Sequence, residues 1–73
     1  MNPMRTNLQA ARKAKGLTQM QMAEMLGISL RYYQNIETGE RNGDFEIWDK
    51  LEDITGIHQR ILRFQDRGKA DNP

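Results

Sequence analysis

Residues 29–38 carry side chains that can form paired hydrogen bonds with the edges of nucleic-acid bases. Arg31 has a planar guanidinium and Gln34 has an amide, and each presents two polar atoms side by side. In the same segment Tyr33 and Ile36 are apolar and lie three residues apart, which predicts a helix with the polar residues on its other side. Such a helix can carry side chains into the major groove of DNA, so the segment predicts base readout.

Four residues on the outer side of this helix are expected to contact bases near its N-terminal end. Arg31 could donate two hydrogen bonds to guanine O6 and N7. Either Gln34 or Asn35 could pair with adenine N6 and N7, and Leu30 could contact a thymine methyl group. Gln19, in the first turn of the preceding helix, is expected to hold a phosphate through its amide and the free N–H groups there. That contact would fix the position of the protein along the DNA without distinguishing one base pair from another.

Cap residues and apolar spacing predict five helices and no strand. Thr6 with Gln9 and Thr18 with Gln21 have the spacing of capping boxes. The expected helices are one over about 7–15, one from a Thr18 cap to Gly27, one over 29–38 capped by Ser29, one from an Asp44 cap to Gly56, and one within 57–64. The pattern predicts an all-α, compact five-helix bundle over residues 1–64, with residues 65–73 as a flexible polar tail.

Apolar residues at helical intervals give the expected core. Its members are Met22, Ala23, Leu26, Ile28, Tyr33, Ile36, Phe45, Trp48, Leu51 and Ile54. Trp48 could instead contact a partner, but its spacing from Phe45 and Leu51 favours the core. Met20 and Met25 are expected at the surface.

Length and composition exclude several classes of protein. A chain of 73 residues without cysteine makes one domain with neither a disulfide framework nor a thiolate metal site, and it suits a cytoplasmic location. No apolar run is long enough for a signal peptide or a membrane span. His58 has no second metal ligand near it, and Asp49, Glu52 and Asp53 are expected to form a solvated helix face. We find no nucleophile with a base and no phosphate loop, so we expect no enzyme, no cofactor, no metal and no small-molecule ligand.

The net charge of +1 is spread unevenly along the chain. Residues 1–43 hold six Lys or Arg against three Glu, whereas residues 44–73 hold five against seven acidic residues. Such a split would orient the molecule in the field of DNA phosphates with its acidic helix turned away. The alternative is that these charges form an ordinary solvated surface without this role.

A fixed pattern of residues runs through the middle of the chain. Leu17-Thr18-Gln19, Ala23, Leu26-Gly27-Ile28-Ser29 and Ile36-Glu37-Thr38-Gly39 stand at constant spacing. Over about residues 5–64 the sequence resembles the helix-turn-helix family of lambda-type repressors and Cro. The resemblance implies a five-helix DNA-binding domain.

The resemblance also implies roles for individual residues. Ser29, Leu30, Arg31 and Asn35 match base-facing or groove-edge positions. Gln19 and Thr38 match phosphate-contacting positions, and Arg41 and Asn42 lie in the loop that contacts the backbone. Arg12 and Glu37 match a pair that forms a salt bridge between the first and third helices in relatives. Thr18 and Tyr32 are further candidates for phosphate contact, with Tyr32 equally suited to the core.

Several positions depart from the family pattern. The loop after Gly39 lacks the usual proline, which puts its course and its phosphate contacts in question. Glu52 and Thr55 replace apolar residues, so the fourth helix is expected to pack differently, with Trp48 filling the gap. His58 replaces a serine cap, which is expected to weaken that cap. Leu30 is apolar where the family is usually polar, so fewer hydrogen bonds are expected there.

These observations predict a sequence-specific regulator of transcription, of the repressor type, that binds a double-stranded DNA operator. A homodimer is expected, with Ile57, Ile61 and Phe64 as its interface. The alternative is a protein-interaction module, such as an antitoxin or anti-repressor, that uses the same fold; the near-neutral charge and Leu30 favour it slightly.

Overall fold

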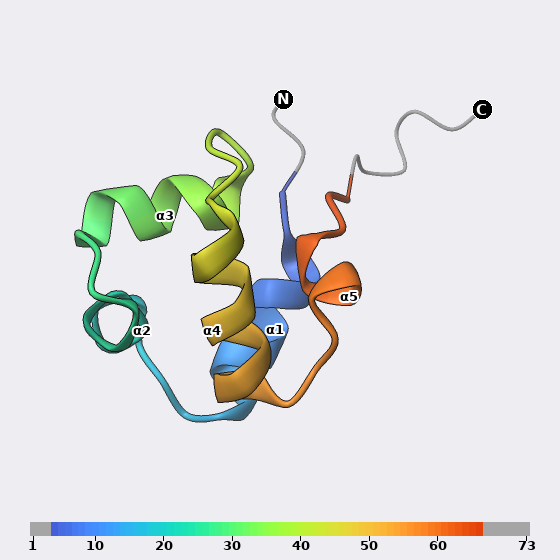
Figure 1. Cartoon of the computed structure of the whole chain (residues 1–73), viewed down its shortest axis with the longest axis horizontal. Helices are drawn as coiled ribbons and strands as arrows, with labels where there is room; N and C mark the ends of the chain where they lie inside the picture. The colour runs from blue at the N-terminus through green and yellow to red at the C-terminus, as the bar shows by residue number, and fades with distance from the viewer. Residues whose placement is uncertain (1–3, 67–73) are drawn as a thin grey trace.

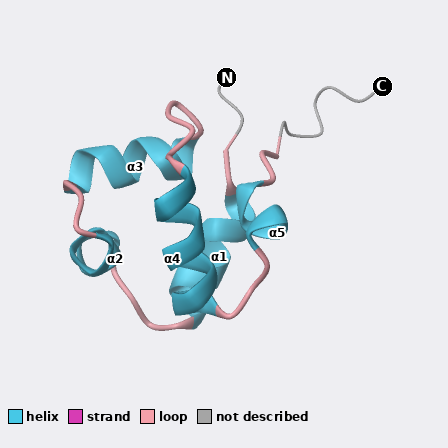
Figure 2. Ribbon diagram, viewed as in Figure 1, coloured by secondary structure: helices cyan, strands magenta, loops and turns pink. Residues whose placement is uncertain are grey.

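Helices are the only regular elements in residues 4–66, the part of the chain that the computed structural model describes (Figures 1 and 2). They are α1 (Thr6–Ala14), α2 (Gln19–Leu26), α3 (Leu30–Thr38), α4 (Phe45–Thr55) and α5 (Gln59–Arg63). The expected all-α, five-helix fold is confirmed, with small shifts at the helix ends. None of these helices is long and apolar enough to cross a membrane.

Local side-chain caps begin three of the helices where the sequence places them. The Thr18 hydroxyl accepts from the Gln21 N–H at 3.0 Å, and the Gln21 side chain accepts from the Thr18 N–H at 2.9 Å. Ser29 caps α3 and Asp44 caps α4 in the same way. At α5 the His58 ring accepts from the Arg60 N–H at 3.0 Å, so histidine supplies a cap in place of serine. These bonds satisfy N–H groups that would otherwise lack a partner.

The expected capping box at the start of α1 is wrong. Helix α1 already begins at Thr6, and Arg5 occupies the cap position without a side-chain bond to the helix. Instead, the Arg5 N–H donates to the Glu37 carbonyl at 2.9 Å, and the Arg5 side chain turns into the protein. A contact with α3 therefore determines where α1 starts.

The core draws on all five helices and contains most of the expected residues. Its buried apolar members are Leu8, Ala11, Met22, Ala23, Leu26, Tyr33, Ile36, Ile47, Trp48, Leu51 and Leu62. Tyr32, Ile28 and Ile54 are partly buried against it. Met20 and Met25 are exposed, as expected.

Helix α4 packs through Trp48, Leu51 and Ile54 as expected, but the first residue of the expected stripe lies outside the core. Phe45, predicted to be buried, is 72% exposed, whereas Ile47 and Thr55 join Trp48 and Leu51 inside. The buried residues recur at 47, 51 and 55, which is the spacing of one helix face, and Phe45 lies off that face. Thr55 stays buried because its hydroxyl donates to the Leu51 carbonyl at 2.8 Å.

The two ends of the described chain come together. Helices α1 and α5 pack against each other, as Figure 1 shows. Beside them, Met4 and Asp66 form an isolated antiparallel bridge through backbone bonds of 3.2 and 2.6 Å. Gln65 and Asp66, which we placed in a flexible tail, thus belong to a segment that hydrogen-bonds to the domain. Residues 67–73 of that tail lie outside the described residues.

Candidate nucleic-acid interface

Helices α2 and α3 form a compact pair joined by a short turn (Figure 1). Gly27 ends α2 at a φ of +74°, a conformation that side chains with a Cβ rarely adopt. The Ile28 N–H then donates to the Ala23 carbonyl at 3.0 Å, and Ser29 caps α3. Because hydrogen bonds fix the turn both to the end of α2 and to the start of α3, α3 is held at a fixed angle to α2.

One side of α3 is buried and the other is accessible. Tyr33, Ile36 and Glu37 are buried. The candidates for base contact lie around the other side: Ser29 and Arg31 are exposed, and Leu30, Gln34 and Asn35 are half-buried. The sequence therefore predicted correctly which residues of α3 share the accessible surface, although Gln34 lies at its edge against α2.

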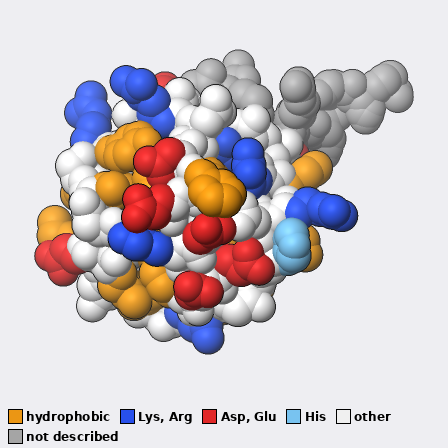
Figure 3. All heavy atoms as spheres, in the orientation of Figure 1, with side chains coloured by type: hydrophobic (Ala, Val, Ile, Leu, Met, Phe, Trp, Pro, Cys, Tyr) orange, Lys and Arg blue, Asp and Glu red, His pale blue; other side chains and the backbone are white. Residues whose placement is uncertain are grey.

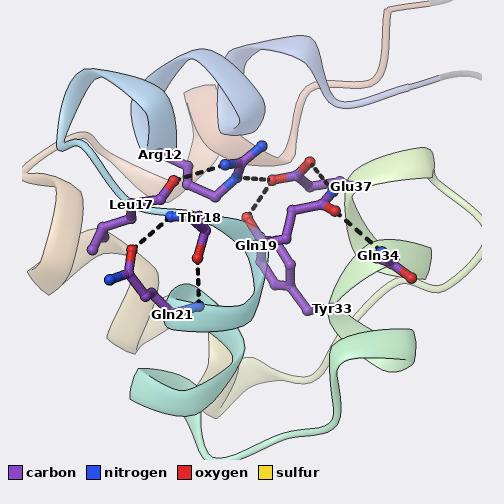
Figure 4. Close-up of polar contacts among 8 residues, drawn as sticks. All are labelled: Arg12, Leu17, Thr18, Gln19, Gln21, Tyr33, Gln34 and Glu37. Carbon is purple, nitrogen blue, oxygen red and sulfur yellow. Dashed lines mark hydrogen bonds and ion pairs between the residues drawn. The ribbon is translucent and has the colours of Figure 1, made fainter.

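A buried carboxylate ties α1, α2 and α3 together (Figure 4). Glu37 is 1% exposed, and its Oε2 accepts from Arg12 Nε at 2.7 Å and from the Tyr33 hydroxyl at 2.6 Å. Its Oε1 accepts from Gln19 Nε2 at 3.0 Å. Arg12 also donates to the Leu17 carbonyl at 2.8 Å. The Arg12–Glu37 ion pair that the resemblance implies is thus present, and three donors compensate the buried charge.

The pKa values of the partners of Glu37 follow from this arrangement. Burial acts to lower the pKa of Arg12, but the hydrogen bond to Glu37 and its charge outweigh burial and raise the pKa. Burial, reinforced by the hydrogen bond to Glu37 and its charge, raises the pKa of Tyr33 well above its ordinary range. Tyr33 therefore keeps its proton and serves as a donor.

Gln19 and Gln34 extend the network to the accessible surface. Gln34 Nε2 donates to Gln19 Oε1 at 3.1 Å, while Gln19 donates to Glu37. The sequence predicted a phosphate contact for Gln19 and a base contact for Gln34, but not the bond between them. Both ends of the Gln19 amide are engaged inside the protein, which leaves one Nε2 proton for a phosphate.

Sequence reasoning missed Arg5, which is 4% exposed. Its guanidinium donates to the carbonyls of Ile36, Arg41 and Arg63, and it stacks 5.2 Å from the centre of the Trp48 ring. Burial, followed by the charge of Arg63, lowers the pKa of Arg5. No local pattern could have revealed this role, because the contacts on Ile36 and Arg41 lie more than thirty residues away in the sequence.

The loop after α3 keeps a defined course without the family's proline. The Arg41 N–H donates to the Asn35 carbonyl at 3.1 Å, and Trp48 Nε1 donates to the Asn42 carbonyl at 2.8 Å. The side chains of Arg41 and Asn42 remain exposed. At the end of α3, the Thr38 hydroxyl donates to the Asn35 carbonyl at 3.1 Å.

Comparison with known proteins decides the family. A model described as helix-turn-helix matches residues 8–58, which is most of the chain. The chain belongs to the lambda-repressor/Cro-like helix-turn-helix family. This helix-turn-helix protein is 33% identical to the restriction-modification controller protein C.AhdI from Aeromonas hydrophila, whose crystal structure it matches with a TM-score of 0.68. The match covers 78% of this chain and 86% of that chain. No protein of curated function matches the chain.

Family membership gives the accessible side of α3 its meaning. The protein is a DNA-binding transcription regulator of the helix-turn-helix type. Helix α4 carries three exposed acidic side chains, Glu46, Asp49 and Asp53, and the exposed Asp44 caps it. Figure 3 shows acidic side chains gathered on one face of the molecule. DNA phosphates repel such a face, whereas the accessible side of α3, at positions 29–31, 34 and 35, carries no acidic side chain.

Proposed function

We propose that this regulator binds a double-stranded DNA operator sequence-specifically and represses transcription by occupying it. Helix α3 enters the major groove with its accessible side against the base edges. The observation that carries the proposal is that Tyr33, Ile36 and Glu37 hold α3 against the core while Arg31 and Asn35 are left on the opposite side. The controller protein among the similar structures supports a regulatory role.

The chemistry of each side chain on α3 assigns its partner on DNA. Arg31 is exposed and donates two bonds to a guanine. Asn35 and Gln34 are the amides that pair with adenine, and Leu30 contacts a thymine methyl group. Ser29 already uses its hydroxyl oxygen to cap α3, so it contributes at the edge of the groove.

Phosphates are contacted from both sides of α3. On one side lies the start of α2, with Thr18, Gln19 and its free N–H groups, and on the other lie Thr38, Arg41 and Asn42. The half-buried Tyr32 of α3 is a further candidate for a phosphate contact. The Thr18 hydroxyl accepts from the Gln21 N–H and keeps its own proton for a phosphate. Arg41 is exposed, so its charge is available to the DNA backbone.

The operator is read by a homodimer. Ile61 is 50% exposed and Phe64 is 59% exposed, and both border a shallow hollow beside α1, while Ile57 is half-buried against the core. An apolar surface at this place favours a two-fold contact between copies. Two copies would present their α3 helices to half-sites about 34 to 36 Å apart, one turn of DNA.

Paired variants test the proposal after selection of a binding sequence from random duplexes. Arg31→Ala is expected to cost about 1 to 3 kcal/mol and to relax preference at one base position. Arg41→Ala is expected to weaken binding to every sequence alike and to reduce the salt dependence by about one unit of slope. Gel-shift titrations in which the two variants behave identically would refute the assignment.

A second candidate function is supported by two observations. Leu30 places an apolar side chain on the accessible side of α3, and the net charge is only +1. Both suit a module whose third helix binds a protein, such as an antitoxin or anti-repressor. Measuring the affinity for random duplex DNA at several salt concentrations separates the two functions. An affinity that falls steeply as salt rises supports DNA binding, because groove binding releases counterions. If no binding is detected even at low salt, the protein-binding module is supported.

A further inference from the structure

The side-chain amide of Gln19 connects the buried Glu37 carboxylate to Gln34 (Figure 4). Glu37 is itself held by Arg12 and Tyr33, so the connection starts from a fixed point. We propose that Gln19 is a positioning residue that determines which end of the Gln34 amide is presented to DNA. This inference rests on the proposed binding of α3 in the major groove.

The chemistry of the groups fixes the direction of each hydrogen bond. A carboxylate only accepts hydrogen bonds, so the end of Gln19 that meets Glu37 must be its NH₂ group. The Gln19 oxygen then faces Gln34, which must donate a hydrogen bond to it from its own NH₂ group. If the Gln34 amide turned over, two carbonyl oxygens would face each other. Gln19 cannot turn to relieve that contact, because its oxygen would then face the carboxylate.

The constrained amide leaves a specific pair of atoms for a ligand. Gln34 Oε1 accepts no hydrogen bond within residues 4–66, and one proton of Nε2 is left over after the bond to Gln19. An acceptor oxygen beside an N–H matches adenine, which offers the N6 donor and the N7 acceptor in the major groove. Guanine offers two acceptors there, and its O6 would face the Gln34 oxygen. Gln34 therefore selects adenine at one position of the half-site, and Gln19 sets the strength of that selection.

Two roles of Gln19 predict different results. A phosphate contact changes the affinity for all DNA sequences by the same factor, whereas positioning of Gln34 changes the preference at one base position. The experiment measures the affinity of wild type, Gln34→Met, Gln19→Met and Gln9→Met for the selected duplex. It repeats the measurement on duplexes that carry the other three base pairs at each position. Gln9→Met is the control, since Gln9 is a half-buried glutamine of α1 outside this network.

The positioning role predicts a local loss of discrimination. Gln34→Met removes the preference for adenine at one position. Gln19→Met weakens the preference at that same position about fivefold, the value of one neutral hydrogen bond, and leaves the preference ratios at all other positions unchanged. Gln9→Met changes none of the ratios. A Gln19→Met variant that keeps full preference for adenine, or that lowers affinity by one common factor for all sequences, overturns the proposal.

Measurements on the free protein keep the test independent of DNA. In wild type, the side-chain amide protons of Gln19 and Gln34 should exchange with solvent more slowly than those of an exposed glutamine. Gln19→Met should return the Gln34 protons to the fast rate. Fast exchange at both residues in wild type overturns the proposal even if the variant fails to fold. A wild type that shows no base preference anywhere, but slow exchange at both residues, refutes the proposed function instead.

Discussion

Removal of Arg12 is the perturbation whose consequence the structure determines most fully. Arg12 is 6% exposed and Glu37 is 1% exposed, and Arg12 Nε lies 2.7 Å from Glu37 Oε2. Arg12→Met leaves a buried carboxylate with two neutral donors, Tyr33 and Gln19, in place of three donors. Removing one partner of a buried ion pair lowers the free energy of unfolding by about 3 to 5 kcal/mol. Because two donors still bind Glu37, we expect a loss at the lower end, about 3 kcal/mol.

That loss is large against the stability of a small domain. At the usual stability per residue, a chain of this size has a free energy of unfolding of about 4 to 11 kcal/mol, so the variant loses about a quarter of it or more. The assay is urea unfolding at pH 7 followed by the fluorescence of Trp48, which is 1% exposed. Lys13→Met, on the exposed side of α1, is the matched control and should stay within about 0.5 kcal/mol of wild type.

A double variant separates the ion pair from simple loss of packing. Glu37→Gln in the Arg12→Met background removes the uncompensated charge, so the double variant should be more stable than Arg12→Met alone. The reasoning is refuted if Arg12→Met costs less than about 1 kcal/mol, or if the two substitutions destabilise additively.

Three further predictions concern the loop, the buried phenol and the proposed dimer. Gly43→Ala should destabilise by about 2 to 3 kcal/mol in thermal unfolding, because φ is +73° and a Cβ would lie 3.0 Å from the indole nitrogen of the single tryptophan. Gly56→Ala, with φ +75° and nothing within 4 Å, should cost only about 1 kcal/mol, and equal costs would contradict the role of the indole. Because burial and Glu37 raise the pKa of Tyr33, the unfolded chain loses this proton near pH 10 while the folded protein keeps it; stability should therefore fall as pH rises above about 10. In Tyr33→Phe the free energy of unfolding, measured by urea unfolding at each pH, should fall less steeply with pH. An unchanged slope would show that Tyr33 is not the source of the fall. Phe64→Glu should convert the proposed dimer to monomers in sedimentation, whereas Phe45→Glu, at an exposed site on α4, should not.

Local signals in the sequence predicted most of the helices. The caps at Thr18, Ser29 and Asp44 form because each side chain reaches an N–H three residues ahead, a geometry that needs no tertiary contact. The spacing of Tyr33 and Ile36 likewise placed the core side of α3 correctly.

The failures arise where distant segments decide the outcome. Arg5 is held by carbonyl groups of α3 and the following loop, and this contact overrides the capping box expected at Thr6. In α4, Phe45 and Ile47 are both apolar, and only packing against the other helices decides that Ile47 is inside. Spacing along one helix also cannot show that Gln34 meets Gln19 of the neighbouring helix. Contacts between elements therefore carried the information that the local patterns lacked.

Titration of the isotopically labelled protein with a selected duplex, followed by NMR, tests the central claim most directly. If the accessible side of α3 lies against base edges, the largest backbone shift changes will fall on Arg31, Asn35 and the first turn of α2. Residues of the acidic side of α4 will then change little. Changes concentrated on α4 or α5, with Arg31 and Asn35 unaffected at saturation, would contradict the account.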